Sequence, residues 1–212
     1  MCPMESAPDL DGRTALVTGS AKRVGRELLL TIAACGADVV VHYKNSADAA
    51  EETAAAAREY GVDATVVQGD ITDPKSVDAM FSAAESALGT VDILVNNAGA
   101  NWGAPLKEYP DAGFAKVMDT NLNAVFALTR DLVPALARAA TTDSPSRIVN
   151  IGSMDGIHVP IVQRVPTFAY SASKAALHHL TKALAVELSA QHITANAIAP
   201  GFFELKMTDH VF

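Results

Sequence analysis

Short runs of β-branched and aliphatic residues alternate with longer, alanine-rich segments along most of this chain. Several of the short runs are apolar at consecutive positions, which is typical of parallel strands covered by helices on both faces. The pattern predicts strands over Thr14–Thr18, Asp38–Tyr43, Ala64–Gln68, Val91–Asn96, Arg147–Ile151 and Ile193–Ala199. It predicts helices over Val24–Cys35, Ala47–Tyr60, Pro74–Leu88, Asp111–Ala139 and Phe168–Ser189.

This alternation predicts βαβ units and therefore an α/β fold, a doubly wound Rossmann domain with a parallel sheet. A chain of 212 residues is long enough for one domain with a full hydrophobic core. No linker, repeat or low-complexity tract divides it, so we expect one domain over residues 1–212. Pro134 lies inside the predicted helix Asp111–Ala139 and should kink or split it, with a tolerated kink as the simpler expectation.

Composition narrows the class of protein. Half of the residues are hydrophobic, and the net charge of −8 argues against a nucleic-acid-binding surface. Cys2 and Cys35 are too few for a disulfide framework and lack metal-ligand spacing, so we expect reduced thiols in a cytoplasmic protein. The first eleven residues do not resemble a secretory signal, and no apolar run reaches the length of a membrane span.

Tyr170 and Lys174 are the first candidates for chemistry. Residues four apart share one face of a helix, so a phenol and an ammonium lie one turn apart. A free tyrosine has a pKa of about 10, and a nearby positive charge lowers that pKa by favouring the phenolate. Such a pair could exchange protons with an alcohol or a carbonyl near neutral pH. The alternative for an isolated pair of this spacing is an ordinary helix surface.

Three further motifs precede this pair. A glycine-rich stretch, Val17 to Gly25, follows the first apolar run, Asn96-Asn97-Ala98-Gly99 follows another, and Ser153 closes a third. In order and spacing these elements resemble the short-chain dehydrogenase/reductase family, from about Asp11 to Thr208. The resemblance is closest to ketoacyl-reductase and gluconate-dehydrogenase members of the NADP type. It implies a Rossmann fold that binds a nicotinamide dinucleotide.

The cofactor site implied by the resemblance departs from the family at one position. The family turn reads Gly-x-x-x-Gly-x-Gly, and Arg23 stands here in place of the middle glycine. Lys22-Arg23 resembles pteridine reductases, where a basic pair is well placed for an adenosine 2′-phosphate. NAD-preferring relatives carry an acid at the end of the second strand, where this chain reads Tyr43-Lys44-Asn45-Ser46. We therefore expect NADP(H). The alternative for Lys44 alone is a solvated charge on a loop.

The same resemblance assigns the rest of the cofactor contacts. Asp70 and Ile71 would flank the adenine, although an isolated Asp after a strand is more often a turn or helix-capping residue. Small residues would let the backbone approach the ribose, and a Pro-Gly turn would lie beside the nicotinamide. The full expected set is Gly19, Lys22, Arg23, Val24, Gly25, Tyr43, Lys44, Asn45, Ser46, Asp70, Ile71, Asn97, Ala98, Gly99, Pro200, Gly201 and Phe202.

The resemblance also implies four catalytic residues. Tyr170 would donate the proton to a carbonyl, and Lys174 would lower the tyrosine pKa and bond the nicotinamide ribose. Ser153 would polarise the substrate oxygen, as an oxyanion hole does. Asn121 would distort its helix and hold a water that relays protons to Lys174. Taken singly, Ser153 could be a turn serine and Asn121 a surface amide.

Substrate contacts are expected from the loop 157–166. Ser153 and Tyr170 are 17 residues apart, a few more than is usual in the family, and the extra length falls in this loop. His158, Gln163 and Arg164 are candidates for substrate contact, against the default of an exposed polar loop. His178 and His179 are expected to serve packing or subunit contacts, and no metal site is expected.

The leading functional hypothesis is an NADPH-dependent carbonyl reductase, or secondary alcohol dehydrogenase. A β-ketoacyl thioester, a polyketide-type aromatic ketone, a sugar acid and a small xenobiotic ketone remain open as substrates, and pteridine reduction is a weaker variant. Family members continue past Phe212 through further helix and a last strand, so Ile193–Ala199 would form an exposed edge. A catalytically silent nucleotide-binding subunit or a truncated fragment is therefore the alternative. The long helices Asp111–Ala139 and Phe168–Ser189 favour a homodimer over a homotetramer.

Overall fold

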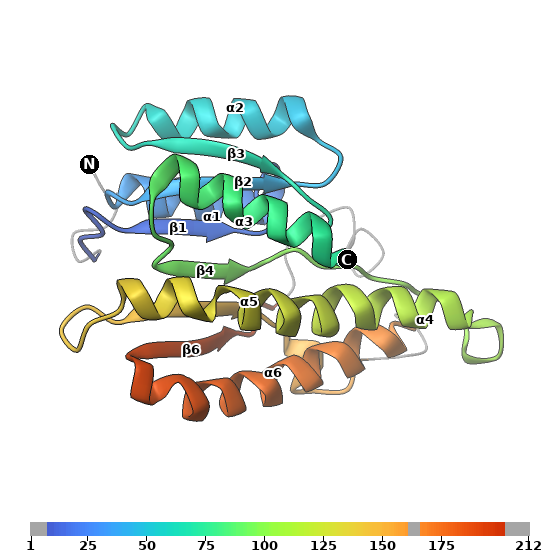
Figure 1. Ribbon diagram of the computed structural model, residues 1–212. Coiled ribbons are helices and arrows are strands. Elements are labelled where there is room, and N and C mark those ends of the chain that lie inside the picture. Colours follow the sequence, from blue (N-terminus) through green and yellow to red (C-terminus); the bar gives the residue numbers. More distant parts are fainter. Residues whose placement is uncertain (1–7, 161–165, 202–212) are drawn as a thin grey trace.

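Six parallel strands form one sheet in the residues that this computed structural model describes, 8–160 and 166–201. Their order is β3-β2-β1-β4-β5-β6, so the direction of winding reverses between β1 and β4. All pairings are parallel, and the C-terminal ends of the strands therefore share one edge (Figure 1). The strands are β1 (Thr14–Val17), β2 (Asp38–Tyr43), β3 (Ala64–Gln68), β4 (Ile93–Asn96), β5 (Ser146–Ile151) and β6 (Ile193–Ile198).

Helices cover both faces of the sheet, which confirms the predicted doubly wound α/β fold (Figure 1). One face packs against α1 and α2, and the other against α3, α5 and the end of α6. Helix α4 continues the line of α5 and projects beyond the strand ends (Figure 1). The helices are α1 (Arg23–Ala34), α2 (Ala47–Arg58), α3 (Pro74–Leu88), α4 (Asp111–Met118), α5 (Ala124–Ala139) and α6 (Phe168–Leu188).

Alternate residues along the strands pack into two hydrophobic cores, one on each face of the sheet. In β1, Val17 packs into the core under α1 and α2, whereas Leu16 packs into the core under α3 and α5. Small residues such as Ala54, fully buried on α2, let that helix lie close to the sheet. Burying a leucine or valine contributes about 1.5–3 kcal/mol each, so these two layers hold the strand ends in place.

The predicted helix Asp111–Ala139 is interrupted, but not where Pro134 predicted. A π-helical turn, Asp119–Asn123, separates α4 from α5, and Asn121 lies at its centre. Pro134 is inside α5, which continues to Ala139. A proline removes one backbone hydrogen bond, and the flanking Leu132 and Leu136 are buried in the core, which keeps this helix intact.

The other predicted elements agree with the structure to within two residues at each end, the usual range for helix and strand boundaries. Short 3₁₀ turns add Leu106–Glu108, Met154–Gly156 and Ser189–Gln191. Strand β6 lies at an edge of the described sheet, with Ile193 buried and Ile198 about half exposed. No helix in the described ranges is long and apolar enough to cross a membrane.

Candidate active site

The turn between β1 and α1 needs glycine at two of the predicted positions. Gly19 has a positive φ of 67°, a conformation that glycine adopts without strain. A Cβ on Gly25 would lie 2.5 Å from the carbonyl oxygen of Gly19, which leaves no room for a side chain. Arg23, at the position of the family's middle glycine, also has a positive φ, of 56°. The turn therefore keeps the glycine-type backbone there while presenting an exposed guanidinium.

The segment after β4 closes over this turn. Asn97 donates from Nδ2 to the carbonyl oxygen of Thr18 at 2.8 Å, and the Ala98 amide donates to the Thr18 hydroxyl at 3.0 Å. Ala98 is packed so closely that a Cβ on Gly19 would lie 3.2 Å from it. These contacts join two sequence motifs that are about 80 residues apart, as expected of neighbouring parallel strands.

A cavity of about 890 Å³ opens at the C-terminal ends of the strands, next to the turn between β1 and α1. Among the predicted cofactor residues it is lined by Gly19, Lys44, Asn45, Asp70, Ile71, Ala98 and Gly99. Its opposite wall comes from α4, the π-helical turn and α5, through residues such as Lys116, Asp119 and Asp131. No sequence motif marks this second wall, because its polar residues have the spacing of any exposed helix face.

Asp70 accepts hydrogen bonds within its own turn and also lines the cavity. Its carboxylate pairs with the Lys44 ammonium and accepts hydrogen bonds from the Thr72 amide and hydroxyl at 3.0 and 2.7 Å. The hydrogen bond from Lys44, above all, lowers the pKa of Asp70 to about 2. The turn role was the simpler expectation for this residue, and the structure combines that role with a position in the cavity.

His42 is a residue of this cavity that the sequence analysis did not identify. The ring is almost fully buried at the end of β2, where Nδ1 accepts from the Gly19 amide at 2.9 Å. Its other nitrogen lies 3.1 Å from the Gly69 carbonyl oxygen and therefore carries the proton. His42 thus ties the glycine-rich turn to the residue before Asp70. A histidine directly after three buried valines is the signal that could have identified it.

Burial lowers the pKa of His42, partly offset by its hydrogen bond to Gly69 and by the Asp70 charge. The unfolded chain takes up this proton near pH 6.5, whereas the folded chain resists it, so the free energy of unfolding should fall as pH drops below about 6.5. Denaturant unfolding at pH 7.5 and 5.5 should show that loss reduced in His42→Asn. The exposed His179→Asn serves as the control; an equal loss in His42→Asn and wild type would contradict the assignment.

Asn121 distorts its helix as predicted, and the π-helical turn directs its amide into the protein. The side chain is buried, with Oδ1 accepting from the Ala100 amide at 2.8 Å. Its Nδ2 donates to the Ala100 carbonyl at 2.9 Å and to the Ser173 hydroxyl at 3.0 Å. Asn121 therefore connects the segment after Gly99 to helix α6, one residue before Lys174. It is not the surface amide of the alternative interpretation.

Ser153, Tyr170 and Lys174 converge where β5 ends against α6. The Ser153 hydroxyl lies close enough to the Tyr170 phenol to act on its pKa. Lys174 is buried, and its Nζ lies 5.6 Å from the centre of the Tyr170 ring and donates to the Ile151 carbonyl at 2.6 Å. A Cβ on Gly99 would lie 4.0 Å from Nζ, so the segment after β4 passes beside the ammonium.

The prediction that Tyr170 has a lowered pKa is wrong for this structure. Burial raises the pKa of the phenol, and the nearby Asp155 charge adds to the increase, while the Ser153 hydrogen bond opposes it. Burial also lowers the pKa of Lys174 to about 8. Sequence spacing alone could not show this, because desolvation of both groups depends on how deeply α6 packs.

The remaining predicted residues surround these two clusters. Lys22 and Val24 flank Arg23 in the turn, Tyr43 ends β2, and Ser46 precedes α2. The Pro200 carbonyl accepts from the Met154 amide at 3.0 Å, which places Pro200-Gly201 beside Ser153. His158 is exposed, while Phe202, Gln163 and Arg164 lie outside the described residues. Within the described ranges, no three His, Cys, Asp or Glu side chains cluster as metal ligands would.

Comparison with known proteins agrees with this geometry. A sequence model of the short chain dehydrogenase family matches residues 13–212. The chain belongs to this family of oxidoreductases, which uses nicotinamide cofactors and acts on small molecules. A curated short-chain dehydrogenase relative, the rhamnolipids biosynthesis 3-oxoacyl-[acyl-carrier-protein] reductase of Pseudomonas aeruginosa, is 40% identical over 202 residues, which is 95% of this chain and 77% of that protein.

Solved structures of the short-chain dehydrogenase fold give the same result. The Pseudomonas aeruginosa RhlG/NADP active-site complex superimposes with a TM-score of 0.88 at 39% identity, over 96% of this chain and 77% of that one. An NAD⁺-bound xylitol dehydrogenase superimposes with a TM-score of 0.84 at 31% identity, over 92% and 72%. The solved structures with this fold thus include one in complex with NADP and one bound to NAD⁺.

Proposed function

We propose that this chain is an NADPH-dependent carbonyl reductase that interconverts a ketone and a secondary alcohol. The observation that carries the proposal is the convergence of Ser153, Tyr170 and Lys174 beside Gly99, next to the glycine-rich turn. The one domain of residues 1–212 would thus hold both the dinucleotide site and the catalytic residues. Its expected location is the cytoplasm.

The residues of the turn and cavity fit a dinucleotide. Gly25 has no room for a Cβ, so the turn stays tight at the start of α1, where backbone amides and the helix dipole favour a phosphate. A cavity of about 890 Å³ continues from Gly19 to Asp70 for the adenosine. Bound NADPH would supply the hydride at this site.

The raised pKa of Tyr170 suits proton donation. The phenol stays protonated at neutral pH, so it can give its proton to the oxygen of a carbonyl that gains a hydride. Ser153 would bond the same oxygen and polarise it. With a pKa of about 8, Lys174 is mainly an ammonium at pH 7, and it would stabilise the phenolate left on Tyr170 and bond the nicotinamide ribose. Asn121 would hold the water that returns a proton towards Lys174.

Three bases favour NADP(H) over NAD(H). Lys22 and Arg23 are exposed at the turn, and Lys44 lines the cavity at the end of β2, where NAD-preferring relatives carry an acid. Arg23 occupies a backbone conformation that costs a non-glycine residue about 1–2 kcal/mol, which is consistent with a function for its side chain. The relative solved as an NADP complex is also similar over more of the chain than the NAD⁺-bound one.

The substrate is a ketone or secondary alcohol whose identity the site leaves open. A β-ketoacyl thioester is favoured by likeness to the 3-oxoacyl reductase, and a sugar-derived substrate by likeness to the xylitol dehydrogenase. The aromatic and small xenobiotic ketones remain part of the proposal as test compounds. Of the loop 157–166, His158 is the described polar candidate for contact with them.

Titration with NADPH and, separately, NADH tests the proposal. Trp102 lies three residues after Gly99 and can report binding through its fluorescence. We expect NADPH to bind more tightly than NADH, and a panel of the four ketone classes to show NADPH oxidation. NADPH binding without turnover on any ketone would instead support a silent nucleotide-binding subunit. Equal affinity for both dinucleotides would contradict the assigned 2′-phosphate site.

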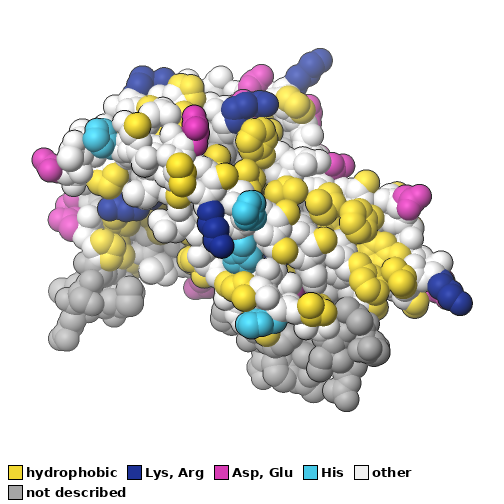
Figure 2. Space-filling view, turned by 90° about the horizontal axis from the view of Figure 1, so that it is seen from below, with side chains coloured by type: hydrophobic (Ala, Val, Ile, Leu, Met, Phe, Trp, Pro, Cys, Tyr) yellow, Lys and Arg dark blue, Asp and Glu magenta, His cyan; other side chains and the backbone are white. Residues whose placement is uncertain are grey.

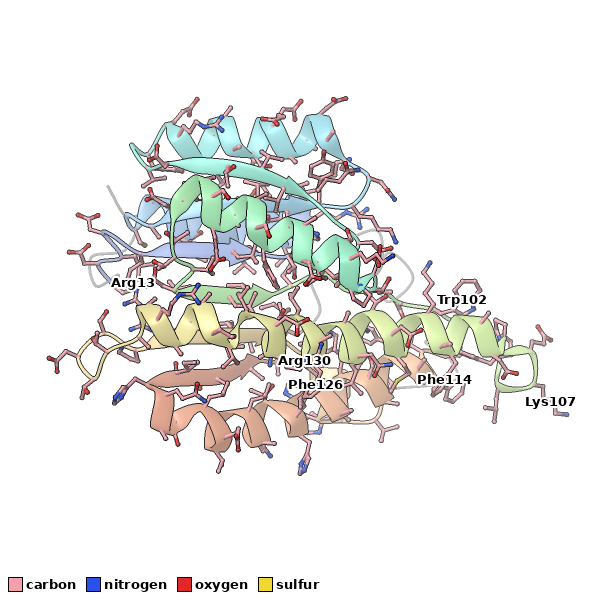
Figure 3. All side chains as sticks on the ribbon, viewed as in Figure 1. Arg13, Trp102, Lys107, Phe114, Phe126 and Arg130 are labelled. Atoms are coloured by element: carbon pink, nitrogen blue, oxygen red, sulfur yellow. The ribbon has the colours of Figure 1, made fainter. Side chains whose placement is uncertain are left out.

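We further propose a homodimer formed through α4, α5 and α6, with a tetramer as a second assembly. Phe114 on α4, Phe126 on α5 and Val186 on α6 are each more than 40% exposed. Figure 2 shows hydrophobic side chains gathered towards the α4 end of the molecule, and Figure 3 places Phe114 and Phe126 along α4 and α5. Sedimentation equilibrium giving the mass of one chain would exclude this assembly.

A further inference from the structure

Three successive turns of α6 contact the same short segment at the end of β5. Tyr170, Lys174 and His178 are four residues apart and form one stripe along the helix. The Tyr170 phenol faces the Ser153 hydroxyl, and Lys174 donates to the Ile151 carbonyl at 2.6 Å. The Nε2 of His178 lies 3.0 Å from the Ser153 carbonyl oxygen and 3.4 Å from the Ser153 amide nitrogen. The stripe therefore extends the Tyr170–Lys174 pair by one more turn.

The imidazole of His178 fills the space left by glycines on either side of Ser153. A Cβ on Gly152 would lie 2.4 Å from Cε1 of the ring and 2.7 Å from Nε2. A Cβ on Gly156 would lie 2.7 Å from Cδ2. The ring thus touches the backbone both before and after Ser153, and neither position has room for a side chain while it stays there.

The Ser153 side chain depends on this backbone for its direction. Its hydroxyl oxygen accepts from the Asp155 amide at 3.2 Å, in the 3₁₀ turn that ends with Gly156. Displacing this short turn would move the hydroxyl away from the Tyr170 phenol. A misplacement of about 1 Å in a catalytic group can cost about 100-fold in rate.

We propose that His178 is a positioning residue that holds the Ser153 backbone so that the hydroxyl meets Tyr170 and the substrate oxygen. The inference rests on the proposed carbonyl reduction. It replaces the general packing or subunit-contact role expected for His178 with a specific one. His179, the next residue, is exposed and provides a matched control.

The first test compares His178→Gln with His178→Asn. The Gln amide reaches the place of Nε2 and the shorter Asn amide does not, so Gln should retain most of kcat. His178→Asn should lose about 10- to 100-fold in kcat, with the Kd for NADPH unchanged, because the ring contacts the Ser153 backbone and is not among the residues assigned to the dinucleotide. His179→Asn should match the wild type. Equal kcat in the two His178 variants, or a loss confined to NADPH binding, would overturn the proposal.

A double-mutant cycle separates positioning from a general loss of packing. If His178 acts through Ser153, then His178→Asn should cost nothing further in a Ser153→Ala background, whereas independent effects would multiply. Multiplied losses would overturn the proposal. A wild-type chain that reduces no ketone would refute the proposed function itself, while an active wild type with an unaffected His178→Asn would refute only the role of His178.

Discussion

Replacing Tyr170 with Phe should reduce NADPH-dependent ketone reduction by about 10²- to 10⁴-fold, the contribution of a positioned general acid. The change removes one oxygen atom, which faces the Ser153 hydroxyl and would donate the proton to the substrate. Because phenylalanine keeps the ring and the lost hydroxyl is assigned to the substrate oxygen, the Kd for NADPH should be essentially unchanged. Stopped-flow turnover and fluorescence titration on the same preparation measure the two quantities.

Tyr60→Phe is the matched control for this prediction. Tyr60 is half exposed just after α2, and loss of its hydroxyl should alter neither turnover nor binding. Retained turnover in Tyr170→Phe would refute Tyr170 as the proton donor. A parallel loss of NADPH binding would show that the phenol supports the cofactor site instead of the chemistry.

Replacing Arg23 with Gly should weaken NADPH binding by about 10- to 100-fold and leave NADH binding unaltered. A charge-assisted hydrogen bond contributes about 1.5–3 kcal/mol, and each 1.4 kcal/mol is a factor of about ten in Kd. The guanidinium would make this bond only with the 2′-phosphate, which NADH lacks. Glycine accepts the positive φ of this position, so the turn itself should be preserved.

Thermal unfolding of Arg23→Gly distinguishes loss of the charge from loss of the turn. Relief of the left-handed backbone strain should offset the extra freedom of glycine in the unfolded chain, and the melting temperature should not fall. Arg26→Ala is the control, because Arg26 lies one turn along α1 and pairs with Glu27. An equal loss of NADPH affinity in both variants would mean that general positive charge, and not Arg23, selects the cofactor.

Local patterns were sufficient for most of the fold. Consecutive apolar residues in β1 and β2 predicted buried parallel strands, and the strand–helix alternation predicted the doubly wound sheet. The interruption between α4 and α5 was predicted only through the family resemblance, which expected Asn121 to distort its helix. Pro134 was the visible helix breaker, yet the π-helical turn occurs at Asn121, whose amide bonds Ala100 and Ser173 from other elements. Contacts with distant segments therefore decided where this helix is interrupted.

Some residues of the candidate site were also predictable from the sequence, and others were not. Family spacing predicted Ser153, Tyr170 and Lys174, and the structure brings them together. Family spacing did not predict the contacts of His42 and His178. Their partners are backbone atoms of Gly19, Gly69 and Ser153, and such partners leave no signal in the sequence. The ionisation of Tyr170 was predicted with the wrong sign, because helical spacing identifies a neighbouring charge and not the depth of burial.

The sequence by itself was enough for the parallel α/β architecture, which follows from the hydrophobic periodicity of the chain. Its motifs also resembled a known family, and that resemblance implied the family and the residues at the turn and at the end of β5. Only the tertiary structure decided the protonation preferences, the wall that α4 and α5 add to the cavity, and the contact of His178 with the Ser153 backbone. Each depends on desolvation or on contacts between distant segments, and these exist only once the layers have packed.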